Sequence, residues 1–293
     1  MKLTVEIDPR SGFCGGVIRA IDGAQKFLEE HPGEPLYSLG AIVHNEEELG
    51  RLSSLGLKTV DKLEDAGKMV LVRAHGEPPS TYKKAEELGI SIRDFTCPVV
   101  LNLQKSIREA YLRVKPAGGT VVIFGRIGHA EVLGLQGQAD GDVVVVETVG
   151  MLSDSIRRGE VKLDKSIELY SQTTGNPSVF AEICEYLKSR VKTPSLLKIH
   201  NTICSQVSSR HSQLSLFASS HDVVIFISGR HSSNGKVLYE LCRSINPRSY
   251  HISNAGEVEA SWFKDGDIVG VCGATSTPRW LLQEIAAKIL QLG

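Results

Sequence analysis

Residues 120–129 read Thr-Val-Val-Ile-Phe-Gly-Arg-Ile-Gly-His, a β-branched and aromatic run that ends in a glycine-rich loop with a histidine. Such a run predicts a buried strand, and the loop marks its end. Two other segments show the same order of strand, polar loop with histidine, and helical pattern. They are Met-Val-Leu-Val-Arg-Ala-His-Gly at 69–76 and Asp-Val-Val-Ile-Phe-Ile-Ser-Gly-Arg-His-Ser-Ser-Asn at 222–234. This weak threefold repetition predicts three related lobes.

Twelve short runs of this kind are bounded by Gly, Pro, Asn or Asp, and each is predicted to be a strand. They lie at 3–7, 36–39, 57–60, 69–74, 90–95, 120–125, 142–147, 167–172, 196–200, 222–228, 248–253 and 267–273. Most are separated by segments with helical spacing, as at Val100, Leu103 and Ile107. This alternation is typical of an α/β fold, so we expect three similar α/β lobes with mostly parallel sheets.

The length of 293 residues fits one large α/β domain or two to three lobes of about 100 residues each. We expect seams near residues 98 and 200. The predicted lobes are 1–98 with Cys14 and Cys97, 99–199 with His129 and Glu131, and 200–293 with Cys204 and a Ser-Ser-Asn loop. Because no Pro-rich or Ser-rich linker marks the seams, the lobes are expected to pack tightly around a shared centre.

Charge and hydropathy narrow the function classes. The 33 basic and 34 acidic residues are nearly balanced, which argues against the broad basic face of a nucleic-acid binder. The longest apolar runs, such as 143–146, fall far short of the roughly 18 residues that a bilayer span needs. Residues 1–7 have the pattern of a strand and not of a signal peptide, so we expect a cytoplasmic protein.

Cys14, Cys97 and Cys204 share one local context, since each follows an apolar strand and stands where a helical pattern begins. Pro98, directly after Cys97, suits the first position of a helix. A thiol at a helix N-terminus meets the positive end of the helix dipole, which favours the thiolate form that ligates metals. One such cysteine per predicted lobe is what a metal site between three lobes requires.

The other three cysteines are predicted to be core residues. Cys184 and Cys242 lie on apolar helical faces, and Cys272 ends a buried strand. Neither a Cys-x-x-Cys pair nor zinc-finger spacing occurs. Three thiolates without an obvious fourth ligand leave an open coordination position, which belongs to catalytic metal sites. Both an iron–sulfur cluster and zinc with a histidine as the fourth ligand satisfy this pattern.

The predicted strand ends are rich in small polar residues and histidines. These loops are Val43-His44-Asn45, Ala74-His75-Gly76, Gly128-His129-Ala130-Glu131, Ser171-Gln172-Thr173-Thr174-Gly175, His231-Ser232-Ser233-Asn234-Gly235 and Ala274-Thr275-Ser276-Thr277-Pro278. Hydroxyls, amides and imidazoles near helix starts bind phosphate or diphosphate groups, although they also serve as ordinary helix caps. The chain has neither the dinucleotide-binding glycine motif nor a P-loop. Glu131, two residues after His129, is a candidate proton donor or a helix N-terminal acid.

Nine short motifs, taken in order along the chain, resemble the 4-hydroxy-3-methylbut-2-enyl diphosphate reductase family, the oxidoreductases of the last step of non-mevalonate isoprene biosynthesis. They are Gly12-Phe13-Cys14-Gly15-Gly16, Val43-His44-Asn45, Arg73-Ala74-His75-Gly76, Thr96-Cys97-Pro98, Gly128-His129-Ala130-Glu131-Val132, Gln172-Thr173-Thr174, Ile203-Cys204, Ser232-Ser233-Asn234 and Ser276-Thr277-Pro278. The resemblance covers nearly the whole chain.

The resemblance implies a trilobal protein around one central 4Fe-4S cluster per chain, held by Cys14, Cys97 and Cys204. It implies a substrate pocket made of His44, His75, His129, Thr173, Ser232, Ser233, Asn234 and Ser276. The implied catalytic residues are Glu131, His129 and Thr173, with the proton delivered through Glu131.

The implied activity is the reductive dehydroxylation of an allylic diphosphate to isopentenyl and dimethylallyl diphosphate. The substrate oxygen would bind the unique iron, and ferredoxin or flavodoxin would supply two electrons. Family members often carry Thr three residues after the third cysteine, where this chain has Val207, so one polar contact near the ligand is expected to be missing. Two other classes fit the residues themselves: a zinc hydrolase with Glu131 as general base, and a non-enzymatic iron–sulfur sensor.

Overall fold

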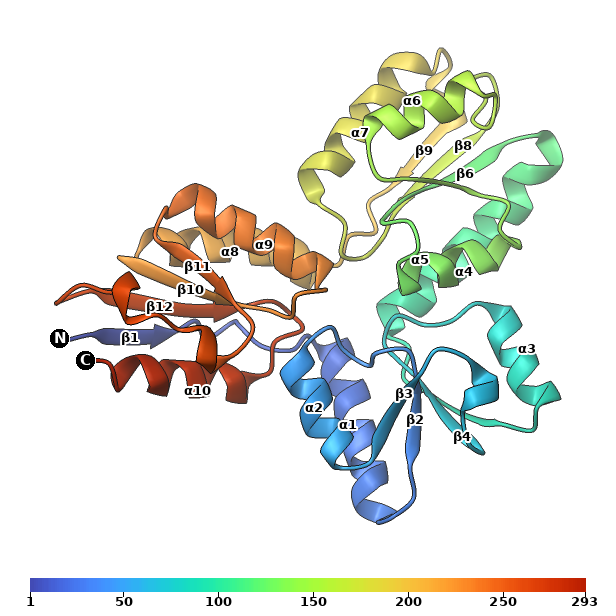
Figure 1. The fold of residues 1–293 in the computed structure, drawn as a ribbon. Helices are drawn as coiled ribbons and strands as arrows, with labels where there is room; N and C mark the ends of the chain where they lie inside the picture. The colour runs from blue at the N-terminus through green and yellow to red at the C-terminus, as the bar shows by residue number, and fades with distance from the viewer. The chain divides into compact units, whose positions relative to one another are not determined.

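The computed structural model describes residues 1–293, except for the side chain of Ser233. The chain divides into two compact units, one made of residues 1–67 and 205–293 and the other of residues 68–204. Each unit is an α/β structure in which helices alternate with short strands (Figure 1). The lobe boundaries proposed near residues 98 and 200 remain predictions.

The first unit combines both ends of the chain. Its elements are β1 (Thr4–Ile7), α1 (Gly15–Glu30), β2 (Leu36–Leu39), α2 (Glu46–Ser54), β3 (Leu57–Val60), η1 (Leu63–Asp65), α8 (Ser205–Ser219), β10 (Val223–Ile227), α9 (Ser233–Ile245), β11 (Ser249–Ile252), η5 (Ala255–Glu257), η6 (Ala260–Trp262), β12 (Ile268–Gly273) and α10 (Arg279–Leu290). One parallel sheet has the order β1-β12-β10-β11, so the first strand of the chain pairs with the last. β2 and β3 are also parallel neighbours.

The second unit is one continuous segment. Its elements are β4 (Met69–Val72), α3 (Pro79–Glu87), β5 (Ser91–Asp94), α4 (Pro98–Val114), η2 (Lys115–Ala117), β6 (Thr120–Phe124), α5 (Ala130–Gln136), η3 (Gly137–Ala139), β7 (Val144–Val146), α6 (Val149–Arg157), β8 (Ile167–Ser171), α7 (Pro177–Arg190), η4 (Pro194–Leu196) and β9 (Leu197–His200). Its four-stranded sheet has the order β7-β6-β8-β9, and β4 pairs with β5.

Two of the three four-stranded sheets, β1-β12-β10-β11 and β7-β6-β8-β9, are covered by helices on their two faces. In the second unit, α4 and α5 pack on one face through Leu103, Ile107 and Leu135, and α6 and α7 pack on the other through Leu152 and Ile183 (Figure 1). In the first unit, α10 covers one face of the sheet and α8 and α9 cover the other. Strands buried on both faces read as continuous apolar runs, which is why β6 and β10 are so clear in the sequence.

The twelve predicted strands are all present, and the strand pairs described above are all parallel. The predicted class of three similar α/β lobes with parallel sheets is therefore confirmed. Cys184, Cys242 and Cys272 lie in the hydrophobic clusters, as predicted. Among the described residues, none of the helices combines the length and apolar character needed to cross a bilayer.

Candidate functional site

The three cysteines proposed as metal ligands stand at the beginnings of helices. Cys14 is the N-cap of α1 and Cys97 is the N-cap of α4, and neither thiol makes a capping hydrogen bond. Cys204 directly precedes α8. All three are half-buried, in contrast to the buried Cys184, Cys242 and Cys272. Partly exposed thiols at the positive ends of helices have the chemistry that an iron–sulfur cluster or a zinc ion requires.

One backbone arrangement recurs at all three cysteines. The amide of Cys14 donates to Thr275 O at 3.0 Å, that of Cys97 to Ala74 O at 3.0 Å, and that of Cys204 to Thr173 O at 2.8 Å. Each accepting carbonyl lies in a loop that carries a predicted ligand-binding side chain or adjoins one. Within each unit, a backbone hydrogen bond therefore links each predicted metal ligand to a loop predicted to bind the substrate.

Strand order explains the recurrence. Cys14, Cys97 and Cys204 follow β1, β5 and β9, whose parallel neighbours are β12, β4 and β8. Parallel neighbours end at the same edge of a sheet, so the loop after one strand meets the loop after the other. The three cysteines therefore occupy equivalent positions in three similar sets of strands. This is the structural counterpart of the weak sequence repeat.

Glu131 and Thr173 form the most enclosed part of the candidate site. Glu131 lies in the first turn of α5, after β6, and Thr173 lies after β8, which pairs with β6. Thr173 N donates to Glu131 Oε1 at 2.7 Å, and Thr173 Oγ1 donates to Oε2 at 2.7 Å. Glu131 is 1% exposed, and burial raises its pKa to about 6 although both Thr173 hydrogen bonds oppose the rise. The carboxyl can therefore carry a proton near neutral pH.

His75 and His129 lie in the same unit as Glu131 and Thr173. Their rings meet edge to face, with centroids 5.2 Å apart. His129 is the N-cap of α5, and its Nδ1 accepts from Glu131 N at 3.3 Å and contacts Gln172 Nε2 at 3.0 Å. Gln172 lies in one of the loops predicted to bind phosphate, but it was not among the predicted site residues.

Gly76 has a positive φ of 70° directly after His75. A Cβ at this position would lie 2.7 Å from Gln104 Nε2 and 2.8 Å from Thr96 Cγ2. Glycine therefore allows the His75 loop to turn and to pack against Gln104 of α4 and against Thr96, the residue before Cys97.

The predicted ligand residues of the first unit also converge. Asn234 Nδ2 donates to Thr275 Oγ1 at 3.0 Å, and Ser232 Oγ contacts Ser276 Oγ at 3.2 Å. The two loops meet because β10 pairs with β12. Ser232 also caps α9 by accepting from Gly235 N. Ser233, another predicted ligand residue, has a side chain that lies outside the described residues.

His44 lies against the loop after β10, which carries Ser232. A Cβ on Gly229 would lie only 2.2 Å from His44 O, so the two backbones are in close contact. Arg230 N donates to Glu46 Oε1 at 3.2 Å and fixes the same approach. The first unit thus gathers His44, Ser232, Asn234 and Ser276, while the second gathers His75, His129, Glu131 and Thr173.

A buried ion pair, which sequence reasoning missed, holds the loop before Cys14. Arg210, on α8, contacts Asp8 and donates to Ser11 Oγ at 2.6 Å. Ser11 Oγ donates to Asp8 Oδ2 and accepts from Gly273 N, each at 2.8 Å. Arg210 is 3% exposed and Asp8 is 4% exposed, so loss of either partner would leave a buried charge alone.

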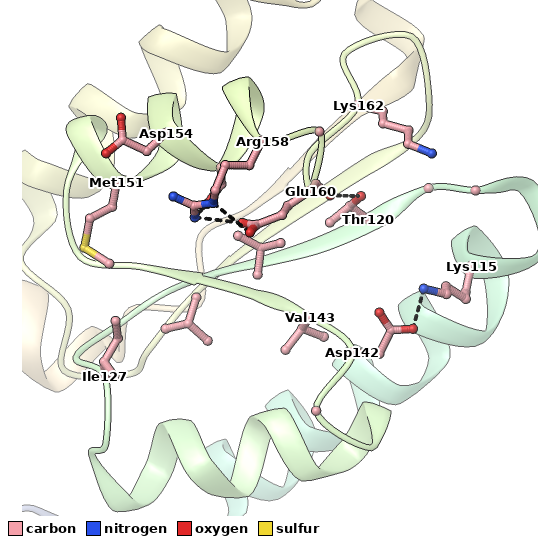
Figure 2. Close-up of a pocket in the computed structure, with 17 residues that line it drawn as sticks. Lys115, Thr120, Ile127, Asp142, Val143, Met151, Asp154, Arg158, Glu160 and Lys162 are labelled. Carbon is pink, nitrogen blue, oxygen red and sulfur yellow. Dashed lines mark hydrogen bonds and ion pairs between the residues drawn. The ribbon is translucent and has the colours of Figure 1, made fainter.

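A cavity of about 690 Å³ lies elsewhere in the second unit (Figure 2). It is lined by Thr120, at the start of β6, and by residues 143–145 along the edge strand. Two ion pairs lie at the cavity, Arg158 with Glu160 at 2.8 Å and Lys115 with Asp142. Among the described lining residues there is none of the predicted site residues, so the cavity is separate from the candidate site.

Comparisons with known proteins show which family this chain resembles. The family model described as LytB protein matches residues 5–290. A curated 4-hydroxy-3-methylbut-2-enyl diphosphate reductase of Bacteroides fragilis is 47% identical over 290 residues, covering 97% of each chain. One of Phocaeicola vulgatus is 45% identical, covering 98% of this chain and 99% of the relative.

Two solved structures are also similar. A structure described as (E)-4-hydroxy-3-methyl-but-2-enyl diphosphate reductase, the terminal enzyme of the non-mevalonate pathway, matches with a TM-score of 0.70 and 32% identity, covering 99% of this chain and 100% of that one. A reductase structure from Plasmodium falciparum matches with a TM-score of 0.84 and 24% identity over 97% of this chain and 86% of that one, and supports the fold alone. The sequence-based resemblance and the oxidoreductase class are thus confirmed: this chain belongs to the LytB family of 4-hydroxy-3-methylbut-2-enyl diphosphate reductases.

Proposed function

We propose that this chain reduces 4-hydroxy-3-methylbut-2-enyl diphosphate to isopentenyl diphosphate and dimethylallyl diphosphate. The overall step removes the allylic hydroxyl as water and consumes two electrons and two protons. The observation that carries the proposal is the chain of contacts from Glu131 through Thr173 to Cys204. Thr173 bonds the buried carboxyl through its amide and hydroxyl, and its carbonyl holds the Cys204 amide. A carboxyl that can carry a proton is therefore connected, through Thr173, to a predicted metal ligand.

We infer that Cys14, Cys97 and Cys204 hold one 4Fe-4S cluster per chain. Their half-exposed positions at helix starts, each tethered to a substrate loop, fit such a group, and three thiolates leave one iron without a protein ligand. When bound, such a cluster would supply the electrons and, at that iron, a Lewis acid for the substrate oxygen.

Glu131 and Thr173 would handle the proton. The pKa of Glu131 is about 6, so a fraction of the carboxyl is protonated at neutral pH and is readily replenished. The Thr173 hydroxyl, 2.7 Å from Glu131 Oε2, can pass that proton onward to the departing oxygen. Hydroxide is a poor leaving group, so protonation of this oxygen is the step for which a buried acid is needed. The allyl fragment is then protonated at either end, which gives the two products.

The diphosphate would be bound by neutral and imidazole donors. His75 and His129 come from the second unit, and His44, Ser232, Ser233, Asn234 and Ser276 come from the first. These groups supply hydrogen bonds without a large fixed charge, which agrees with a formal net charge of −1. Remote binding energy from the diphosphate would hold the hydroxyl end in place.

The electron donor would be a ferredoxin or flavodoxin, and the protein would work in the cytoplasm. Nucleic acid and membrane are not proposed as partners, because the charges are balanced and no described helix is suited to span a bilayer.

The test combines metal analysis with an activity assay. Protein purified without oxygen is expected to contain iron and sulfide and to convert the allylic diphosphate in the presence of a chemical reductant. Cys97→Ser and Cys204→Ser are expected to lose most of the iron, whereas the matched Cys184→Ser should retain it because Cys184 lies in the core. Loss of iron in Cys184→Ser would show that the ligands are wrongly assigned.

Two other outcomes would favour the rival classes. A colourless protein with one zinc ion would support a hydrolase in which Glu131 acts as general base. An intact cluster without turnover of the allylic diphosphate would support a sensor.

A further inference from the structure

Gln172 directly follows β8 and is almost completely enclosed, with 3% of its surface exposed. Its backbone N donates to Phe124 O at 2.7 Å, which ties it to the end of β6. Gly125 makes room for it, since a Cβ there would lie 3.0 Å from Gln172 Cβ and 3.1 Å from its Oε1. The side chain therefore has one position between the loops after β6 and β8.

The two ends of the Gln172 amide are distinguished by their partners. Oε1 accepts from the backbone N–H of Arg126 at 3.0 Å, and a backbone N–H cannot accept a hydrogen bond. The NH2 group is therefore at the opposite end, where it donates to Thr174 Oγ1 at 3.0 Å and faces His129 Nδ1 at 3.0 Å. The reversed amide would place two donors together at Arg126.

His129 Nδ1 is consequently an acceptor. It receives the Gln172 NH2 group and, at 3.3 Å, the backbone N–H of Glu131. In a neutral imidazole one nitrogen accepts and the other carries the proton, so an accepting Nδ1 places the proton of a neutral His129 on Nε2. The contact that fixes the tautomer lies within the second unit and is independent of any ligand.

We propose that Gln172 is a positioning residue that holds His129 with its proton on Nε2, so that this nitrogen presents an N–H donor to a phosphate oxygen of the diphosphate. The inference rests on the proposed function, because it assumes that His129 binds the diphosphate. An ionised phosphate oxygen accepts hydrogen bonds and donates none, so the other tautomer would direct a lone pair at the anion. Gln172 thus lets a neutral histidine bind an anion.

A spectroscopic experiment tests the tautomer directly. In ¹⁵N-histidine-labelled holoenzyme, the His129 signals are assigned by their loss in His129→Asn, a substitution that keeps an N-cap side chain. We expect an unprotonated Nδ1 and a protonated Nε2. In Gln172→Glu the carboxylate accepts where the NH2 group donated, so the proton should move to Nδ1. Gln138→Glu, the same change at an amide that donates to Gly134 O, should leave His129 unchanged. A protonated Nδ1 in the wild type, or an unchanged tautomer in Gln172→Glu, would overturn the proposal.

A double-mutant cycle tests whether Gln172 acts through His129. Calorimetric titration of the holoenzyme with inorganic diphosphate is expected to show about tenfold weaker binding for Gln172→Leu, the loss of one hydrogen bond to a charged group. In the His129→Asn background the same change should have less than about a twofold effect. Independent, multiplying effects would refute the proposal. If Gln172→Leu does not fold, as judged by circular dichroism and iron content, Gln172→Glu replaces it and must obey the same rule.

The two proposals fail in different ways. If the protein does not reduce the allylic diphosphate, the ¹⁵N signals still report the tautomer. If the tautomer is reversed, the reduction assay still reports the activity.

Discussion

The loops after β6 and β8 and the loops after β10 and β12 occupy equivalent positions in two similar sheets, yet their chemistry differs. The first pair contains a buried carboxyl, Glu131, held by two hydrogen bonds from Thr173. The second pair contains no titratable side chain in its described contacts between Ser232 and Ser276 and between Asn234 and Thr275. The first sheet end therefore holds a buried carboxyl, whereas the contacts of Ser232 with Ser276 and of Asn234 with Thr275 at the other sheet end are made by hydroxyl and amide groups.

The difference shows that the same arrangement of parallel strands can carry loops with different chemical roles. In both sheets, two parallel neighbours bring their loops together at the same edge. A carboxyl that is 1% exposed acquires a raised pKa, whereas hydroxyls and amides in a similar position stay neutral. We therefore expect substitutions at Glu131 and Thr173 to change turnover and pH dependence, and those at Ser276 and Asn234 to change diphosphate affinity.

The largest effect is expected for Glu131→Gln. Because the variant lacks the acid that would protonate the leaving oxygen, turnover with a chemical reductant should fall about 10²–10⁴-fold. Iron content and the affinity for inorganic diphosphate should stay close to wild type. Glu185→Gln, the same change at an exposed residue paired with Lys188, serves as the control. Near-normal turnover in Glu131→Gln would remove the proposed difference between the two regions.

A smaller effect of another kind is expected for Ser276→Ala. Loss of one hydroxyl donor to a charged phosphate should raise KM about tenfold with little change in kcat. Ser212→Ala, at an exposed serine on α8, should change neither constant. Steady-state kinetics over a range of substrate concentrations separates the two constants. A fall in kcat with unchanged KM would place Ser276 in the chemical step and contradict the division of tasks.

The pH dependence sharpens the comparison. The acid form of Glu131 disappears as pH rises through its pKa of about 6, so kcat/KM of the wild type should decline above that pH. Thr173→Val removes the Oγ1 hydrogen bond, which stabilises the carboxylate and lowers the pKa. The decline should therefore move to higher pH by about one unit. In Ser276→Ala, kcat/KM should decline at the same pH as in the wild type. If the decline moved to higher pH in Ser276→Ala as much as in Thr173→Val, the decline would not report the ionisation of Glu131.

The smallest effect concerns stability. The pKa of Glu131 rises from 4.5 to about 6 on folding, so its favourable contribution is complete below pH 4.5 and is lost as pH increases through 6. The lost contribution corresponds to about 2 kcal/mol. Between pH 5 and pH 8, the free energy of unfolding should therefore decrease by about 1–2 kcal/mol less in Glu131→Gln than in the wild type. Urea titrations at both pH values measure this difference. Identical decreases would mean that burial does not perturb the carboxyl.

Much of the fold was predictable because the central strands are buried on both faces. The run at 120–125 is clear for this reason, and β6 spans Thr120–Phe124. The run predicted at 142–147 shortens to Val144–Val146, because Asp142 and Val143 make turn hydrogen bonds with Ala139 and Gly141. The helix starts at Cys14 and Cys97 were predicted from the helical patterns that follow them and, at Cys97, from Pro98.

The contacts of the candidate site were much less predictable. Glu131 meets Thr173 because β8 pairs with β6, although β7 lies between them in sequence. Periodicity does not encode this strand order. The ion pair between Asp8 and Arg210 and the amide contact of Gln172 with His129 depend on it in the same way. Residue types could identify candidates, but only the order of strands could pair them.

The pairing of β1 with β12 has a consequence for biogenesis. Residues 68–204 form a continuous unit in which Cys97 and Cys204 find their backbone partners, Ala74 and Thr173. That unit can be completed while the ribosome is still adding the last third of the chain. Cys14 is synthesised first, but its partner Thr275 and the Gly273 amide that bonds to Ser11 emerge last. Cys14 is thus synthesised before the second unit, yet it acquires its backbone partner only after that unit has been synthesised.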